Sequence, residues 1–121
     1  MTPPPAFRVL LVDDNVDTLE SLQILLQALG HEAAIARTPA EAIAQAASYG
    51  ANVAVVDIGL PGMSGYELAP ELRRASPKPL RLVAFTGYAG DEAVARALAA
   101  GFDAHLVKPV EVDRLLAVLA G

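Results

Sequence analysis

Short apolar runs alternate along the chain with longer stretches in which apolar residues recur every three or four positions. Residues 7–12 and 52–56 are almost wholly apolar, which is typical of strands buried on both faces of a sheet. Residues 16–29 place five leucines on one face of a predicted helix: Leu19, Leu22, Leu25, Leu26 and Leu29. This alternation of β-type and helical patterns predicts a parallel α/β sheet.

The same pattern extends to the end of the chain. Strands are predicted at residues 7–12, 31–36, 52–56, 80–85 and 104–107. Each precedes a predicted helix, at about residues 16–29, 39–50, 64–74, 91–100 and 111–119. Capping-box patterns open the second and third helices, at 38–41 and 64–67, and Gly30 stands where the first helix is expected to end. The predicted fold is one doubly wound, five-stranded parallel sheet flanked by five helices.

The amino-acid composition limits the classes of function that this chain could have. The 121 residues fit one domain, and we expect a proline-rich leader at 1–5 followed by the domain at 6–121. A net charge of −5 with scattered basic residues argues against nucleic acid as a partner. Because cysteine is absent, disulfides and cysteine-based metal sites are excluded. No apolar run reaches the length of a bilayer span, so we expect a cytoplasmic domain without membrane contact.

Polar and ionisable residues follow four of the predicted strands. Asp13 and Asp14 follow the first strand, Asp57 the third, Thr86 the fourth and Lys108 the fifth. Because the carboxyl ends of parallel strands share one edge of an open sheet, these five side chains are predicted to converge there.

The residue types indicate phosphoryl chemistry. Three clustered carboxylates form a hard oxygen site suited to Mg²⁺. Lys108 can pair with a carboxylate at rest and with a phosphoryl oxygen after reaction, and the Thr86 hydroxyl can bind another phosphoryl oxygen. A carboxylate placed between a metal and an ammonium group can act as a nucleophile toward phosphorus.

Each residue alone has a simpler interpretation. Asp13 or Asp14 alone is more often the N-cap of the following helix, and Asp57 alone is as readily a carboxylate at a loop start. Thr86 alone is a strand-end hydroxyl, and Lys108 alone a solvated lysine. The order of all these residues at the correct strand ends is what favours a site.

The segments VLLVDDN, VVDIGLPGMSGYEL, LVAFTGYAG and HLVKPV resemble the receiver domain of two-component response regulators. The resemblance covers residues 6–121, and GLPGMSGYEL with AFTGY is most similar to receivers of hybrid sensor histidine kinases. It implies a flavodoxin-like strand order of 2-1-3-4-5.

The resemblance also implies a role for each site residue. Asp57 would accept phosphate from a histidine kinase or a histidine phosphotransfer domain. Mg²⁺, or Mn²⁺, would be held by Asp14, Asp57 and the Gly59 carbonyl, with Asp13 acting through metal-bound water. Thr86 and Lys108 would bind phosphoryl oxygens, and the Lys108–Pro109 bond would be cis. Such a domain catalyses its own phosphorylation and dephosphorylation, with no independent substrate turnover expected.

His105 departs from the family pattern, because the switch residue three positions before the lysine is commonly tyrosine or phenylalanine. Imidazole is smaller and more polar, so inward rotation behind Thr86 is expected to be weaker or pH-sensitive. A structural histidine without a switching role is the alternative. Tyr88 is either a surface aromatic or a gate at the mouth of the site.

Other functions compete with a phosphorylated switch. A receiver-like docking module that no longer switches is favoured only by His105. A haloacid-dehalogenase-type phosphatase would need a second aspartate where Gly59 stands, and dinucleotide binding would need a G-x-G-x-x-G motif after the first strand.

Overall fold

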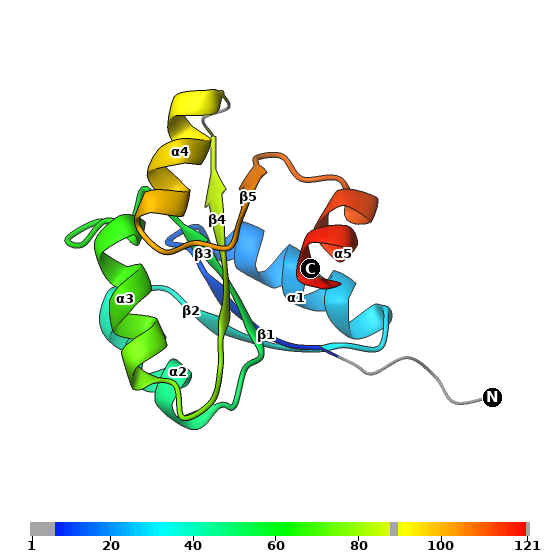
Figure 1. Ribbon diagram of the computed structural model, residues 1–121. Helices are drawn as coiled ribbons and strands as arrows, with labels where there is room; N and C mark the ends of the chain where they lie inside the picture. Colours follow the sequence, from blue (N-terminus) through cyan, green and yellow to red (C-terminus); the bar gives the residue numbers. More distant parts are fainter. Residues whose placement is uncertain (1–6, 88–89, 121) are drawn as a thin grey trace.

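The computed structural model describes residues 7–87 and 90–120, and five strands alternate with five helices in this part of the chain (Figure 1). The strands are β1 (Arg8–Val12), β2 (Glu32–Ala36), β3 (Val53–Asp57), β4 (Arg81–Thr86) and β5 (Ala104–Val107). The helices are α1 (Val16–Ala28), α2 (Pro39–Ser48), α3 (Gly65–Ala75), α4 (Asp91–Ala99) and α5 (Val112–Ala120). The predicted leader and Tyr88 lie outside the described residues.

All five strands are parallel, and their order across the sheet is β2-β1-β3-β4-β5. The order confirms the predicted doubly wound, flavodoxin-like fold. Val9 pairs with Val53, and Val53 with Arg81, so the central strands begin in step and also end together. Residues that follow β1, β3, β4 and β5 therefore meet at one edge of the sheet, as Figure 1 shows for the strand tips.

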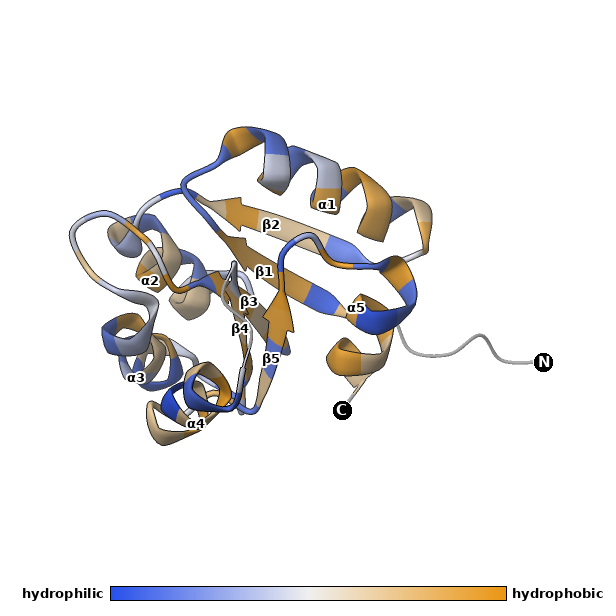
Figure 2. Cartoon of the chain, turned by 90° about the horizontal axis from the view of Figure 1, so that it is seen from above, coloured by the Kyte–Doolittle hydropathy of each residue, from blue (hydrophilic) through white to orange (hydrophobic). Residues whose placement is uncertain are grey.

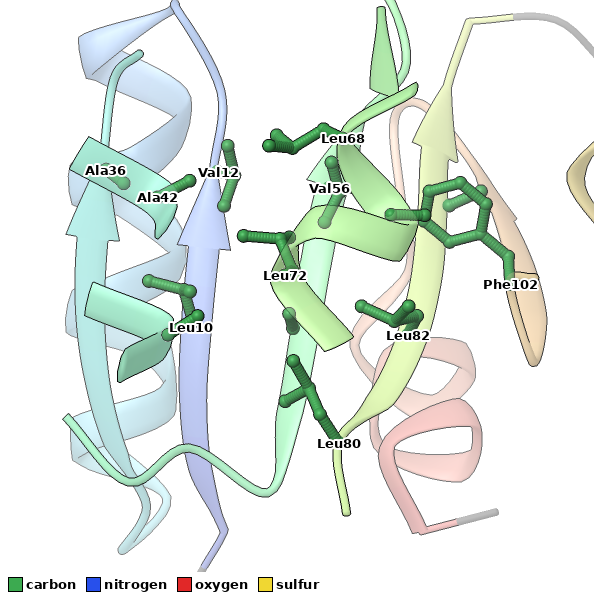
Figure 3. Packing of buried hydrophobic residues seen from close by; sticks show 14 of the residues in the cluster. Leu10, Val12, Ala36, Ala42, Val56, Leu68, Leu72, Leu80, Leu82 and Phe102 are labelled. Atoms are coloured by element: carbon green, nitrogen blue, oxygen red, sulfur yellow. The ribbon is translucent and has the colours of Figure 1, made fainter. Parts of the chain in front are cut away.

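The helices form a layer on each face of the sheet. In Figure 1, α1 and α5 cover one face and α2, α3 and α4 the other. Apolar side chains of each layer pack against the sheet, and Figure 2 shows hydrophobic stretches along the strands and on the helices that cover them. Figure 3 shows the packing between the sheet and α2–α3, with Leu10, Val56, Leu68, Leu72 and Leu82 all buried.

Local capping explains where several helices begin. The Thr38 and Ser64 hydroxyls accept hydrogen bonds from the backbone N–H groups of Glu41 and Glu67, which confirms both capping boxes. The helix α1 ends before Gly30, whose φ of +90° suits glycine. The helix α3 continues through an exposed proline at position 70, so the predicted helix survives there.

None of the described helices is long and apolar enough to cross a membrane.

Candidate functional site

The strand ends bring the predicted polar residues together. Asp57 and Thr86 are the last residues of β3 and β4, Asp13 and Asp14 directly follow β1, and Lys108 directly follows β5. One carboxylate oxygen from each of the three aspartates lies within 4.8 Å of the others. The convergence predicted from the parallel sheet is therefore present for the three carboxylates.

The Lys108 ammonium forms ion pairs with two of these carboxylates. Its ammonium Nζ donates a hydrogen bond to Asp13 Oδ2 at 2.8 Å and lies 3.5 Å from Asp57 Oδ1. Asp13 is only 2% exposed and Asp57 8%, so these charges interact where water screens them little. The lysine thus offsets part of the repulsion between carboxylates that face each other across the site.

Asp57 stands in an environment that disfavours its charge. Burial is the largest effect and raises the pKa of Asp57, and the nearby Asp13 charge raises it further. The hydrogen bond from the Gly59 N–H and the Lys108 ammonium lower it, but the net pKa is raised. The Gly59 N–H donates to Asp57 Oδ1 at 3.1 Å. A carboxylate with a raised pKa gains from any further cation placed beside it.

For Lys108, neighbouring charges affect the pKa more than burial does. Burial by itself lowers the pKa of Lys108, but the hydrogen bond to Asp13 and the charges of Asp13 and Asp57 outweigh it, so the net pKa is raised. The ammonium also lies 5.0 Å from the centroid of the Phe85 ring, within cation–π range. Lys108 therefore remains a cation in this site at neutral pH.

The first aspartates do not cap the following helix. Asn15 is the N-cap of α1, because its side-chain oxygen accepts the Thr18 N–H at 3.1 Å. Asp13 Oδ1 instead accepts the Asn15 N–H at 3.0 Å, which leaves Oδ2 to Lys108. Asp14 is exposed beside them. The capping interpretation of Asp13 and Asp14 is thus wrong, and Asn15 carries that role.

The donor set suits a hard divalent cation. The clustered ligand atoms are all carboxylate oxygens, with no nitrogen or sulfur among them. Two of the three aspartates are buried and one is exposed, so the cluster is reached from solvent on the side of Asp14. These features fit Mg²⁺ or Mn²⁺, whose sites commonly retain several waters.

The backbone beside Lys108 links the ends of β4 and β5. The Lys108 N–H donates to the Thr86 carbonyl at 2.8 Å, and the following Lys108–Pro109 bond is cis, as the family resemblance implies. Thr86 is 5% exposed at the end of β4, and the strand register places Val107 opposite it. Thr86 and Lys108 are thereby fixed relative to each other by main-chain contacts.

His105 is half-buried on β5, opposite Ala84. Since side chains alternate between the faces of a sheet, it shares a face with Thr86. Among the described residues, His105 Nε2 is a buried side-chain atom without a hydrogen-bond partner. Burial lowers the pKa of His105, so the neutral imidazole is favoured in the fold.

This gives a testable pH dependence. The folded state binds fewer protons than the unfolded chain once pH falls through the unfolded pKa of 6.5, so stability is lost from there down to the lowered folded pKa. We expect His105→Phe to remove that loss and to add about 1 kcal/mol by removing the unpaired nitrogen. Urea unfolding of both proteins from about pH 7.5 to about pH 5 measures the difference.

The control is the other histidine of the chain. His31→Gln should retain the acid-side loss that His105 causes. Asp103, Glu111 and Arg114 line the same groove as His105 and are present in all three proteins. Parallel pH profiles for wild type and His105→Phe would contradict the prediction.

Sequence reasoning missed two contacts of the site. It did not identify Asp13 as the carboxylate nearer Lys108, and it did not place the Phe85 ring beneath the ammonium. Both depend on side-chain directions at the strand ends, which residue order alone does not specify. Asn15 could have been found, since asparagine is a preferred N-cap residue.

Comparison with known proteins gives a consistent result. Residues 9–120 match the family described as "Response regulator receiver domain". A response regulator receiver protein of Anaeromyxobacter sp. is 41% identical over 109 residues, which are 90% of this chain and 45% of that protein. The virulence sensor protein BvgS of Bordetella pertussis is 36% identical over 119 residues, covering 93% of this chain and 10% of that protein.

A solved structure matches as well. The chain is similar to a response regulator protein from Burkholderia pseudomallei, with a TM-score of 0.84 and 30% identity over 93% of this chain and 66% of that one. The chain spans less than half the length of both curated relatives. With the family match over nearly the whole chain, the strand order and the clustered aspartates, the chain belongs to the response regulator receiver domain family of two-component signalling.

Proposed function

We propose that this domain is a phosphoryl-accepting switch whose acceptor is Asp57. The observation that carries the proposal is the cluster of Asp13, Asp14 and Asp57 with the Lys108 ammonium 2.8 Å from Asp13 and 3.5 Å from Asp57. The similar response regulator protein from Burkholderia pseudomallei was crystallised with a phosphorylated aspartic acid, which supports the same chemistry here.

The metal-binding proposal follows from the donor set. Asp14, Asp57 and the Gly59 carbonyl would hold Mg²⁺ or Mn²⁺ directly, and Asp13 would act through water. A bound divalent cation would neutralise charge on the transferring phosphoryl group. That cation would favour the charged form of Asp57, whose pKa is raised by burial.

We assign bond formation and the binding of the phosphoryl oxygens to side chains of the chain itself. An Asp57 carboxylate oxygen forms the new bond to phosphorus, while the bond from phosphorus to the donor's imidazole nitrogen breaks and that nitrogen keeps the electron pair. Lys108 would bind a phosphoryl oxygen and exchange part of its contact with Asp57 for it, which its position 3.5 Å from Asp57 Oδ1 supports. The Thr86 hydroxyl would bind a second oxygen. The domain would thus catalyse its own phosphorylation and dephosphorylation without turning over a separate substrate.

Switching would pass from Thr86 to the surface of α4, β5 and α5. We expect phosphorylation to draw Thr86 inward, with His105, on the same sheet face, rotating behind it. Within the described part of the chain, His105 Nε2 has no hydrogen-bond partner, which supports a side chain that is free to rotate. Beryllofluoride with Mg²⁺ should shift amide resonances of β4, β5 and α4; unchanged resonances would favour a docking module without switching.

Receiver domains act with histidine kinases or histidine phosphotransfer domains, and we assign such a protein as the phosphodonor. The match to a small part of a virulence sensor protein supports a receiver module within a hybrid sensor kinase. We expect the domain to act in the cytoplasm.

The test of the function is phosphorylation by a small phosphodonor such as phosphoramidate. The intact mass of the wild-type protein should rise by one phosphoryl group with Mg²⁺ present, and chelation of the metal should reduce the yield at least about tenfold. Asp57→Asn should give no adduct. An adduct of equal yield in that variant would overturn the assignment of Asp57.

A further inference from the structure

A basic groove lies at the end of the sheet opposite the strand-end site. It has a volume of about 800 Å³ and opens to solvent along one side. Its lining comes from the residue before β3, the end of α3, the segment between α3 and β4, the start of β4 and the residue before β5. That segment lies at the lower end of the sheet in Figure 1, away from the tips that carry Asp57 and Thr86.

The charge of the groove opposes that of the chain. Arg73, Lys78 and Arg81 line it against one carboxylate, that of Asp103. Arg8 lies near Lys78. A Cβ built on Gly50 would stand 3.9 Å from Arg8 Nε and 4.0 Å from Lys78 Nζ. Four of the nine basic residues therefore lie at this end of a domain with a net charge of −5, of which Arg8 stands outside the groove lining and is paired with Glu32 at 2.8 Å.

The single carboxylate is already neutralised. Asp103 Oδ2 accepts hydrogen bonds from Arg73 at 3.0 Å and from the Leu82 N–H at 2.8 Å. The donors of Arg73 are also used in hydrogen bonds, because its guanidinium donates to the Gly101 carbonyl at 2.8 Å and the Leu80 carbonyl at 3.3 Å. This pair builds the wall of the groove and leaves its net positive charge to Lys78 and Arg81.

Lys78 and Arg81 are held by contacts of the surrounding chain but form no ion pair among the described residues. Arg81 donates through Nε to the Val118 carbonyl at 2.9 Å, and its terminal nitrogens have no partner among the described residues. The Lys78 ammonium likewise has no ion pair within that part of the chain. Prolines stand on both sides of Lys78, and the Ser76 hydroxyl donates to the Lys78 carbonyl at 2.7 Å. The segment is thus restrained before any ligand arrives.

We propose that this groove binds an acidic polypeptide segment through Lys78 and Arg81. Small-molecule sites bury most of the ligand, whereas this groove is open along one side. Pro77 and Pro79 line the groove beside the two cations, a combination that suits an extended chain bearing carboxylates and an apolar residue. The site is remote from Asp57, so it acts independently of the phosphorylation proposal.

The experiment is an amide NMR titration of the whole chain with acetyl-Glu-Glu-Leu-Glu-Glu-amide. We expect amide shifts at residues 76, 78, 80–82 and 103, with affinity falling about tenfold when NaCl rises from about 50 mM to about 500 mM. Lys78→Gln and Arg81→Gln should each weaken binding about threefold. Arg114→Gln, an exposed cation in another groove, should not, and Asp57→Asn should bind as the wild type does.

Several outcomes would overturn the proposal. They are equal shifts with the glutamine version of the peptide, shifts away from the groove, or unchanged affinity in the Lys78→Gln variant. Because Lys78 is exposed, this variant tests the site even if Arg81→Gln disturbs folding. Inorganic phosphate that reproduces the shifts at equal concentration would indicate a small-anion site instead. Shifts that grow with protein concentration alone would indicate a second copy of the chain.

Discussion

Lys108→Met is expected to lower the free energy of unfolding by about 3 kcal/mol in the absence of divalent cations. The side chain of Asp13 is 3% exposed and that of Lys108 29%, so removal of the ammonium leaves a buried carboxylate without its partner. Asp57 loses its neighbouring cation at the same time. Urea unfolding with a chelator present measures the loss.

Magnesium should recover much of that loss. Because Lys108 and the metal compete for the same carboxylates, we expect the variant to bind Mg²⁺ more tightly and to gain more stability from it than the wild type. The chain has one other lysine, Lys78, which is exposed. Lys78→Met should change the unfolding free energy by less than about 0.5 kcal/mol. Equal losses in the two variants would show that Lys108 carries no special ion pair.

Gly65→Ala is expected to destabilise the fold by about 3 kcal/mol and to slow phosphorylation at least about tenfold. A Cβ on Gly65 would stand 2.7 Å from the Ile58 Cα and 2.8 Å from the Asp57 carbonyl oxygen. Both atoms belong to the backbone, so the acceptor strand must shift to admit the methyl group. Thermal unfolding and the initial rate with phosphoramidate measure the two effects.

Gly62→Ala provides the matched control, in the loop that precedes α3. A Cβ there would meet nothing within 4 Å among the described residues, but φ is +88°. Left-handed backbone strain should therefore cost about 1 kcal/mol and leave the phosphorylation rate unchanged. Comparable slowing in both variants would contradict a specific clash at the acceptor strand.

Much of the fold could be predicted because local and tertiary preferences agree. The apolar runs of β1 and β3 are buried on both faces, and the Thr38 and Ser64 caps begin helices where the pattern predicts them. Predicted and observed bounds differ by at most two residues at any end. Such shifts arise because end residues make few of the contacts that define an element.

The site could be predicted as a convergence of residue types but not as a set of contacts. Parallel strands alone bring Asp13, Asp57 and Lys108 together. The choice of Asp13 over Asp57 as the nearer partner of Lys108 depends on the Asn15 N–H, which orients the Asp13 carboxylate. The basic groove was missed for a similar reason, since Arg8 and Lys78 approach each other only when the sheet assembles.

The central claim is tested most directly by locating the phosphoryl group. Borohydride reduces an acyl phosphate to an alcohol, so a phosphorylated aspartate becomes homoserine and can be found by peptide mass mapping. After phosphorylation with Mg²⁺, we predict homoserine at position 57 and nowhere else. Its appearance at position 13 or 14, or its absence from a protein that has gained the phosphoryl mass, would contradict Asp57 as the acceptor.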